Sequence, residues 1–222
     1  MLREPRPGES EPSPDAISAA VHIDPPWESA PGVPRSPVPS DARQELDRAL
    51  KDVAEVISAH EALTGGGAGR PAQARGAAVT RAGVVLLVAA TEAFIEDLFA
   101  EAAHKMWPGD RRLKDYLETI VTGDRAFANP SVKKTNDLFF GLGMPWVLDS
   151  IRWQKRTNKS FKESLTLLIK RRNQIAHGSK PRPSVQLRQL RAWHRMIAVY
   201  AERLESLVAA RIEAVTGHRP NW

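Results

Sequence analysis

The stretch GVVLLVAATEAFIEDLFAE, residues 83–101, carries the clearest helical pattern in the chain. Its large apolar side chains recur every three or four residues, the spacing that gathers them on one face of an α-helix. The pattern runs to about Met106, where Trp107-Pro108-Gly109 ends it. A helix with such a stripe has to pack against other elements. The stripe consists of Val84, Leu87, Val88, Thr91, Phe94, Ile95 and Leu98.

Helical spacing also marks the segments on both sides. Upstream, Ser40 is a suitable N-cap for a helix whose apolar face includes Leu46, Leu50, Val53, Val56 and Ile57. Residues 64–76, TGGGAGRPAQARG, are expected to form a flexible loop after it. The downstream pattern predicts short helices over 111–121, 132–140 and 145–152, and longer ones over about 160–177 and 184–215. Because no alternating strand pattern and no internal repeat occur, we expect an all-α bundle of four or five main helices.

Composition limits the class of protein. The chain of 222 residues has no cysteine, which excludes disulfides, thiolate zinc sites and a cysteine nucleophile. The longest apolar run, residues 82–90, is shorter than the roughly 20 residues that a membrane helix needs. The N-terminus lacks the apolar segment of a signal peptide. These features predict a cytoplasmic protein outside the membrane.

Charge and proline divide the chain in two. Residues 1–40 hold ten of the 17 prolines and three arginines against six acids, so we expect a disordered acidic tail. Residues 41–222 carry 29 basic and 20 acidic side chains and are expected to form the helical domain. Within that domain, residues 151–191 contain twelve Lys or Arg and one acid, Glu163. Such a block attracts polyanions, with nucleic acid the first candidate, although a basic face can also serve solubility alone.

The stretch LLIKRRNQIAHGSKPRP, residues 167–183, sets polar groups at the end of a predicted helix. At about 100° per residue, Arg172 falls about 20° from Phe161, in the middle of a stripe expected to be buried. A buried guanidinium has to pair inside the fold or open into a cleft. That stripe comprises Phe161, Leu165, Leu168, Ile169, Ile175 and Ala176. His177 lies at the helix end, where its ring can turn back towards the same cleft. An ordinary helix terminus, with basic residues near the last carbonyls and Gly178 at the C′ position, explains the same spacing.

The residues Arg172, Asn173 and His177 resemble the Arg-Asn-x-x-x-His signature of HEPN domains, which are helical bundles with this motif before a final long helix. The stretches GVVLLVAATEAFIEDLFAE and FANPSVKKTNDLFFGLGM further resemble the RiboL-PSP type of HEPN protein. The resemblance implies a metal-independent endoribonuclease without a cofactor. In such an enzyme the 2′-OH of the RNA attacks the adjacent phosphate. His177 would act as acid or base, Arg172 would stabilise the phosphate, and Asn173 would bind a phosphate oxygen or orient the histidine.

The resemblance also implies partners. HEPN ribonucleases pair two protomers, so we expect a homodimer in which two motifs face one cleft. The apolar stripes over 84–98 and 187–208 could supply the interface, although such stripes are more often plain core. An acid on the earlier helix often supports the motif, and Glu92, Glu96 and Asp97 are all candidates. Neighbouring basic residues would hold the RNA backbone: Lys170, Arg171, Lys180 and Arg182. Trp153 and Trp193 can either stack on bases or pack in the core.

Other chemistries find no support in the sequence. The six histidines never fall at metal-ligand spacing, and the Gly-rich residues 64–70 lack the Gly-Lys-Ser/Thr ending of a phosphate loop. The main hypothesis is therefore a HEPN ribonuclease acting as a toxin or defence effector, with RNA as substrate and an antitoxin or sensor protein as a partner. The alternative is a non-catalytic HEPN module that binds RNA or protein, and a purely structural helical adaptor is the third interpretation.

Overall fold

The computed structural model describes residues 38–65, 70–110, 115–116, 119, 127–154, 156–178, 180 and 184–222, with side chains from residue 74 onward in the second range. The helices in these residues are α1 (Asp41–Thr64), α2 (Arg70–Met106), α4 (Val132–Phe140), α5 (Asn158–Ala176) and α6 (Leu187–Thr216). The described residues form no strand, which confirms the predicted all-α fold. Residues 1–37 of the predicted tail, most of the short helix expected over 111–121 and Arg182 lie outside the described residues.

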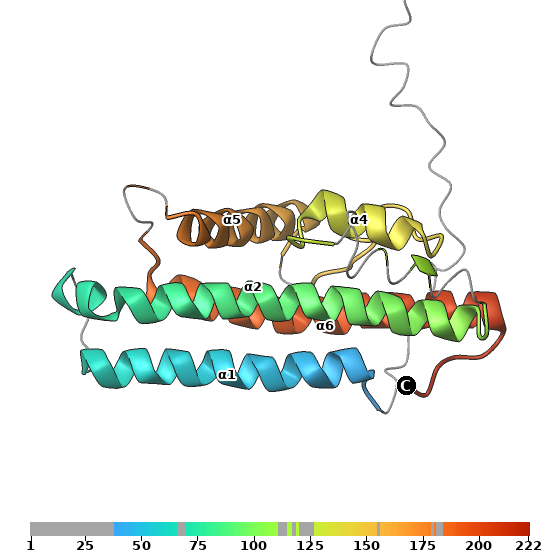
Figure 1. Ribbon diagram of the computed structural model, residues 1–222, viewed down its shortest axis with the longest axis horizontal. Helices are drawn as coiled ribbons and strands as arrows, with labels where there is room; N and C mark the ends of the chain where they lie inside the picture. Colours follow the sequence, from blue (N-terminus) through green and yellow to red (C-terminus); the bar gives the residue numbers. More distant parts are fainter. Residues whose placement is uncertain are drawn as a thin grey trace, which may run out of the picture. The chain divides into compact units, whose positions relative to one another are not determined.

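Helix α2 contacts every other helix of the bundle (Figure 1). The helices α2 and α6 run through its middle, with α1 packed on one side and α4 and α5 on the other. All seven residues of the predicted α2 stripe are buried. The helix starts at Arg70, so the expected loop over 64–76 is too long by seven residues at its end. A proline at position 71 is compatible with this start, because a proline in the first turn removes no hydrogen bond inside the helix.

Helix α2 also has the length and composition of a membrane span. An 18-residue stretch within residues 74–106 has a mean hydropathy of 1.7, a value that the core helix of a soluble protein also reaches. In this bundle the apolar stripe of α2 contacts protein rather than solvent. Its hydropathy is therefore accounted for by its central place, and location outside the membrane stays a prediction.

Helix α1 begins at the expected N-cap. The Ser40 hydroxyl accepts a hydrogen bond from the Arg43 N–H at 3.1 Å, and Gly65 ends the helix with φ +61°. Ser40 itself is buried, and its N–H and hydroxyl both donate to the Glu205 carboxylate of α6. The last residue of the predicted tail is thus bonded to the helical domain.

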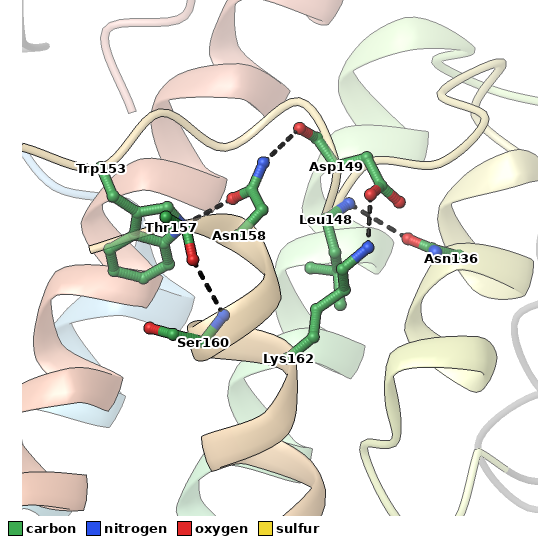
Figure 2. A network of polar contacts seen from close by, with 8 residues as sticks. All are labelled: Asn136, Leu148, Asp149, Trp153, Thr157, Asn158, Ser160 and Lys162. Atoms are coloured by element: carbon green, nitrogen blue, oxygen red, sulfur yellow. Dashed lines mark hydrogen bonds and ion pairs between the residues drawn. The ribbon is translucent and has the colours of Figure 1, made fainter.

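The helix predicted over 145–152 is absent, and this prediction was wrong: the chain makes consecutive turns there. Trp146 adopts φ +55°, which a right-handed helix does not allow. Side chains distant in sequence take the backbone groups that a helix would use (Figure 2). The Asn136 side chain accepts from the Leu148 N–H at 3.0 Å, and the Asn158 side chain donates to the Asp149 carbonyl at 2.6 Å.

Helices α5 and α6 complete the core. Phe161, Leu165, Leu168 and Ile169 of α5 are buried as predicted, but Ile175 is half-buried and Ala176 is exposed. The predicted buried stripe is therefore too long, because the last turn of α5 lies at the surface. In α6 the apolar line is largely buried within the chain, as is that of α2. These two stripes form the core, so they are not available as a dimer interface.

Candidate functional site

The end of α5 has the geometry of a capped helix terminus. His177 is the C-cap residue, and its N–H donates to the Asn173 carbonyl at 3.0 Å. Gly178 follows with φ +64°, a conformation that glycine adopts without strain. The capping interpretation is thus correct for the backbone. The side chains of Asn173 and His177 take no part in the cap, because the cap uses only main-chain atoms.

Arg172 lies between α5 and α2. Its side chain is 30% exposed, and its Nη2 lies 3.9 Å from Oε2 of Glu92, which is 19% exposed. Its Nη1 donates to the Asn173 Oδ1 at 3.2 Å. The guanidinium therefore has an acidic partner and an amide partner, while part of it faces solvent. Among the three acids proposed to support the motif, Glu92 is the one that the structure pairs with Arg172.

Glu92 has a second role that the sequence analysis missed. Its Oε1 accepts a hydrogen bond from the N–H of Asn129 at 2.8 Å. Asn129 has φ +75°, a left-handed conformation that asparagine tolerates better than most residues. One carboxylate thus joins α2, α5 and the segment before α4. The Asn129-Pro130 pair was the available signal, because this dipeptide favours a turn.

Glu96 and Asp97 lie close along α2 but differ in surroundings. Burial, followed by the charges of Glu92 and Asp97, raises the pKa of Glu96 to about 7. Burial also raises the pKa of Asp97, with a further contribution from Glu45 of α1. Asp97 therefore faces α1, whereas Glu92 faces α5. Asp97 is thus the weakest of the three candidates for supporting the motif.

His177 and Asn173 share one side of α5. They line a shallow depression of about 400 Å³, together with Thr166, Ile169, Lys170 and Gln174. Arg172 does not line this depression, because five residues of helix rotate it by about 140° from His177. The expectation that one chain turns both side chains into a single cleft is therefore not met. Asn173 connects them: it accepts from Arg172 and lines the depression with His177.

The basic residues proposed to hold RNA lie around this terminus. Lys170 is exposed and borders the depression with Asn173 and His177. Arg171 is half-buried and donates to the Gln174 side chain at 3.0 Å, and Lys180 is exposed. Positive side chains are therefore available beside the motif.

The two tryptophans considered for base stacking differ. Trp193 is buried in the core, whereas Trp153 is half-buried beside the start of α5. In the described part of the chain, no three His, Asp or Glu side chains gather closely enough to hold a metal ion. The polar groups of the α5 terminus are therefore the chemical groups that the candidate site offers.

Comparison with known proteins adds the family. Neither the curated proteins nor the solved structures contain a match to this chain. The family model described as RiboL-PSP-HEPN matches residues 44–210, a range that includes the helices α2, α4 and α5 and the complete Arg172–His177 motif. The chain therefore belongs to the RiboL-PSP-HEPN family.

Proposed function

We propose that the protein is a metal-independent endoribonuclease. The observation that carries the proposal is the set of side chains at the end of α5, where Arg172 is bonded to Asn173 and Asn173 borders the same depression as His177. An imidazole can transfer the protons and a guanidinium can stabilise the negative charge in phosphate cleavage without a metal, and an amide can add a hydrogen bond to a phosphate oxygen. The family match shows a HEPN-type module, and the activity is our inference from these groups.

The reaction follows from the roles of the side chains. The RNA 2′-oxygen forms a bond to the adjacent phosphorus while its proton passes to a neutral imidazole nitrogen. Arg172 neutralises the negative charge that builds on the phosphate oxygens, and Asn173 donates to one of them. The bond from phosphorus to the 5′-oxygen breaks, and that oxygen takes a proton from an imidazolium. The products are a 2′,3′-cyclic phosphate and a 5′-hydroxyl end.

This scheme uses an acid and a base, whereas the motif supplies one histidine per chain. We therefore propose a homodimer in which His177 of a second copy completes the site. The shallow and exposed depression around His177 supports this arrangement, because a second chain can cover it. The interface has to lie on surface residues near the end of α5, since the long apolar stripes are already buried.

The first test is cleavage of mixed RNA by the full chain in excess chelator. Wild type should cut and leave cyclic-phosphate ends, while Arg172→Ala and His177→Ala should lose activity by a factor of 10² or more. Matched controls are Arg48→Ala on α1 and His104→Ala at the end of α2, both of which replace exposed residues and should cut like wild type. Cutting at the wild-type rate by Arg172→Ala and His177→Ala would refute the assignment of these residues to catalysis.

A non-catalytic HEPN module is the second candidate. The observation that favours it is the pairing of Arg172 with Glu92, because a carboxylate reduces the charge that Arg172 offers a phosphate. Growth arrest on expression, relieved by His177→Ala, would favour the enzyme and a role as a cytoplasmic toxin or defence effector with an antitoxin or sensor partner. Harmless expression together with RNA binding that proceeds without cleavage would favour the binding module.

A further inference from the structure

A second basic site lies away from the motif. A groove of about 460 Å³ runs between the segment before α5 and one face of α6. Trp153 and Arg156 contribute from the segment, and Arg195, Met196, Val199 and Arg203 contribute from α6. Residue 158, where α5 starts, is 19 residues before His177, which corresponds to about 28 Å along the helix. The groove is therefore separate from the candidate catalytic residues.

Positive side chains line the groove, and no acidic side chain of the described residues lines it with them. These positive side chains belong to Arg156, Arg195 and Arg203. No ion pair joins any of the three to another residue in the described part of the chain. The Nε of Arg203 is buried and has no hydrogen-bond partner among the described residues. No protein group in these residues therefore fixes the Arg203 guanidinium through this nitrogen, and the charge of all three arginines is available to an anion in the groove.

Other arginines of the same helix show the contrast. Arg191 pairs with Glu61 of α1, and the Arg211 Nε donates to the Leu142 carbonyl at 2.8 Å. These arginines hold the helices and turns together. The three arginines of the groove have no such structural role in the described residues, and their arrangement around one hollow is therefore better explained by a ligand.

The floor of the groove is apolar. Met196 forms part of it, Val199 is 41% exposed, and the Trp153 ring forms one wall. The Arg156 guanidinium lies 5.8 Å from the centre of that ring. A ligand that fits has to combine negative charge with a flat, weakly polar body. A nucleotide has both, since its phosphate can pair with arginine and its base can pack against an aromatic ring or a guanidinium.

The wall is fixed before any ligand arrives. The Trp153 Nε1 donates to the Asn158 Oδ1 at 2.7 Å, and the Asn158 amide donates to the Asp149 carbonyl (Figure 2). The Trp153 ring also packs on Phe161, with 4.6 Å between ring centres. Little ordering entropy is therefore lost on this side of the groove when a base binds.

We propose that this groove binds a nucleotide of single-stranded RNA, with its phosphate on Arg195 and Arg203 and its base against Trp153 and Arg156. The inference rests on the proposed function in taking RNA as the ligand. The site would hold the strand at a distance from the scissile bond, and an acidic peptide is the other ligand class that the experiment separates.

The test uses the full chain with His177→Ala, so that RNA stays intact. The affinity for a labelled single-stranded eight-nucleotide RNA of mixed sequence is measured at several salt concentrations. Adding Arg195→Ala and Arg203→Ala together should weaken binding at least tenfold, and it should flatten the slope of log K against log salt by about 0.7, the value for the one phosphate that the two arginines would contact. The control adds Arg48→Ala and Lys51→Ala on the exposed face of α1, which removes the same charge.

The outcomes separate this inference from the proposed function. Unchanged RNA affinity in the Arg195/Arg203 variant would refute the proposal that the groove binds RNA. This conclusion would hold even if Arg172→Ala and His177→Ala still abolish cleavage. The wild-type chain could also fail to cut RNA while the Arg195/Arg203 variant binds RNA more weakly. That result would support the RNA site in the groove and refute the proposed ribonuclease activity. Binding of an oligo-glutamate peptide that requires Arg195 and Arg203, with RNA affinity unaffected, assigns the groove to an acidic protein and refutes our proposal.

Discussion

Arg172 and Glu92 form the ion pair that joins the last turns of α5 to the middle of α2, with 3.9 Å between Nη2 and Oε2. The same carboxylate accepts the Asn129 N–H through its other oxygen, so Glu92 is held from two sides. This relationship fixes the direction in which the Arg172 guanidinium points. The ion pair is long and partly exposed, so its contribution to stability is small and its main effect is on orientation.

Glu92→Gln isolates that effect. The amide oxygen of glutamine can still accept from Asn129, whereas the charge that attracts Arg172 is lost. We expect the free energy of unfolding to fall by less than about 1 kcal/mol and RNA cleavage to fall several-fold, because Arg172 loses its fixed direction. Denaturant unfolding and single-turnover cleavage measure the two quantities. Cleavage equal to wild type would show that Glu92 does not position Arg172.

Gly178→Ala tests the geometry of the helix end. Alanine at φ +64° costs roughly 1–2 kcal/mol, and relief of this strain would shift His177 next to it. Gly65→Ala at the end of α1 is the matched control, because its φ is +61° and, as at Gly178, an added Cβ meets no atom within 4 Å. Both variants should lose similar stability, and only Gly178→Ala should lose cleavage. Equal activity in the two would show that His177 needs no precise placement.

The raised pKa of Glu96 predicts how stability depends on pH. The folded chain holds this carboxyl proton up to about pH 7, whereas the unfolded chain releases it near the ordinary value of 4.5. The contribution of Glu96 to the free energy of unfolding is therefore fully present below about pH 4.5 and is lost as pH rises through 7. Glu96→Gln should gain stability over wild type between pH 5 and 8, by less than the roughly 1.4 kcal/mol per pKa unit of full linkage, since the group is half-exposed. A difference in melting temperature between Glu96→Gln and wild type that does not change with pH would contradict the raised pKa of Glu96.

The helices were predictable where local signals agree. Ser40 caps α1 and Gly178 follows α5, as the sequence indicates, and the apolar stripe of α2 is buried throughout. Caps and stripes depend on neighbours within a few residues along the chain. The family motif was found in the same way, because Arg172 and His177 lie on one helix.

The partners of these side chains were not predictable. A helical wheel places Arg172 on the inner face of α5, but the choice among Glu92, Glu96 and Asp97 depends on how α2 is rotated against α5. That rotation results from packing between helices distant in sequence. The arginine groove was missed for the same reason, since Arg156 and Arg203 are brought together only by the packing of the segment before α5 on α6.

The segment over 145–152 shows the limit most clearly, and it supplies the last prediction. Its apolar spacing is typical of a helix, yet Asn136 of α4 accepts the Leu148 N–H at 3.0 Å and fixes a turn. Asn136 is only 7% exposed, so its replacement leaves a buried N–H without a partner. Asn136→Ala should therefore cost about 1–3 kcal/mol of unfolding free energy.

The matched control is Asn221→Ala near the C-terminus, which replaces an exposed asparagine and should change stability by less than about 0.5 kcal/mol. Hydrogen exchange provides the second readout, because the Leu148 amide should lose protection in Asn136→Ala before the amides of α2 do. Loss of protection spread evenly over both segments would mean that Asn136 stabilises the whole bundle rather than this turn. Retained protection at Leu148 would mean that the turn forms without the asparagine, and that the local sequence around Trp146 is sufficient to exclude a helix.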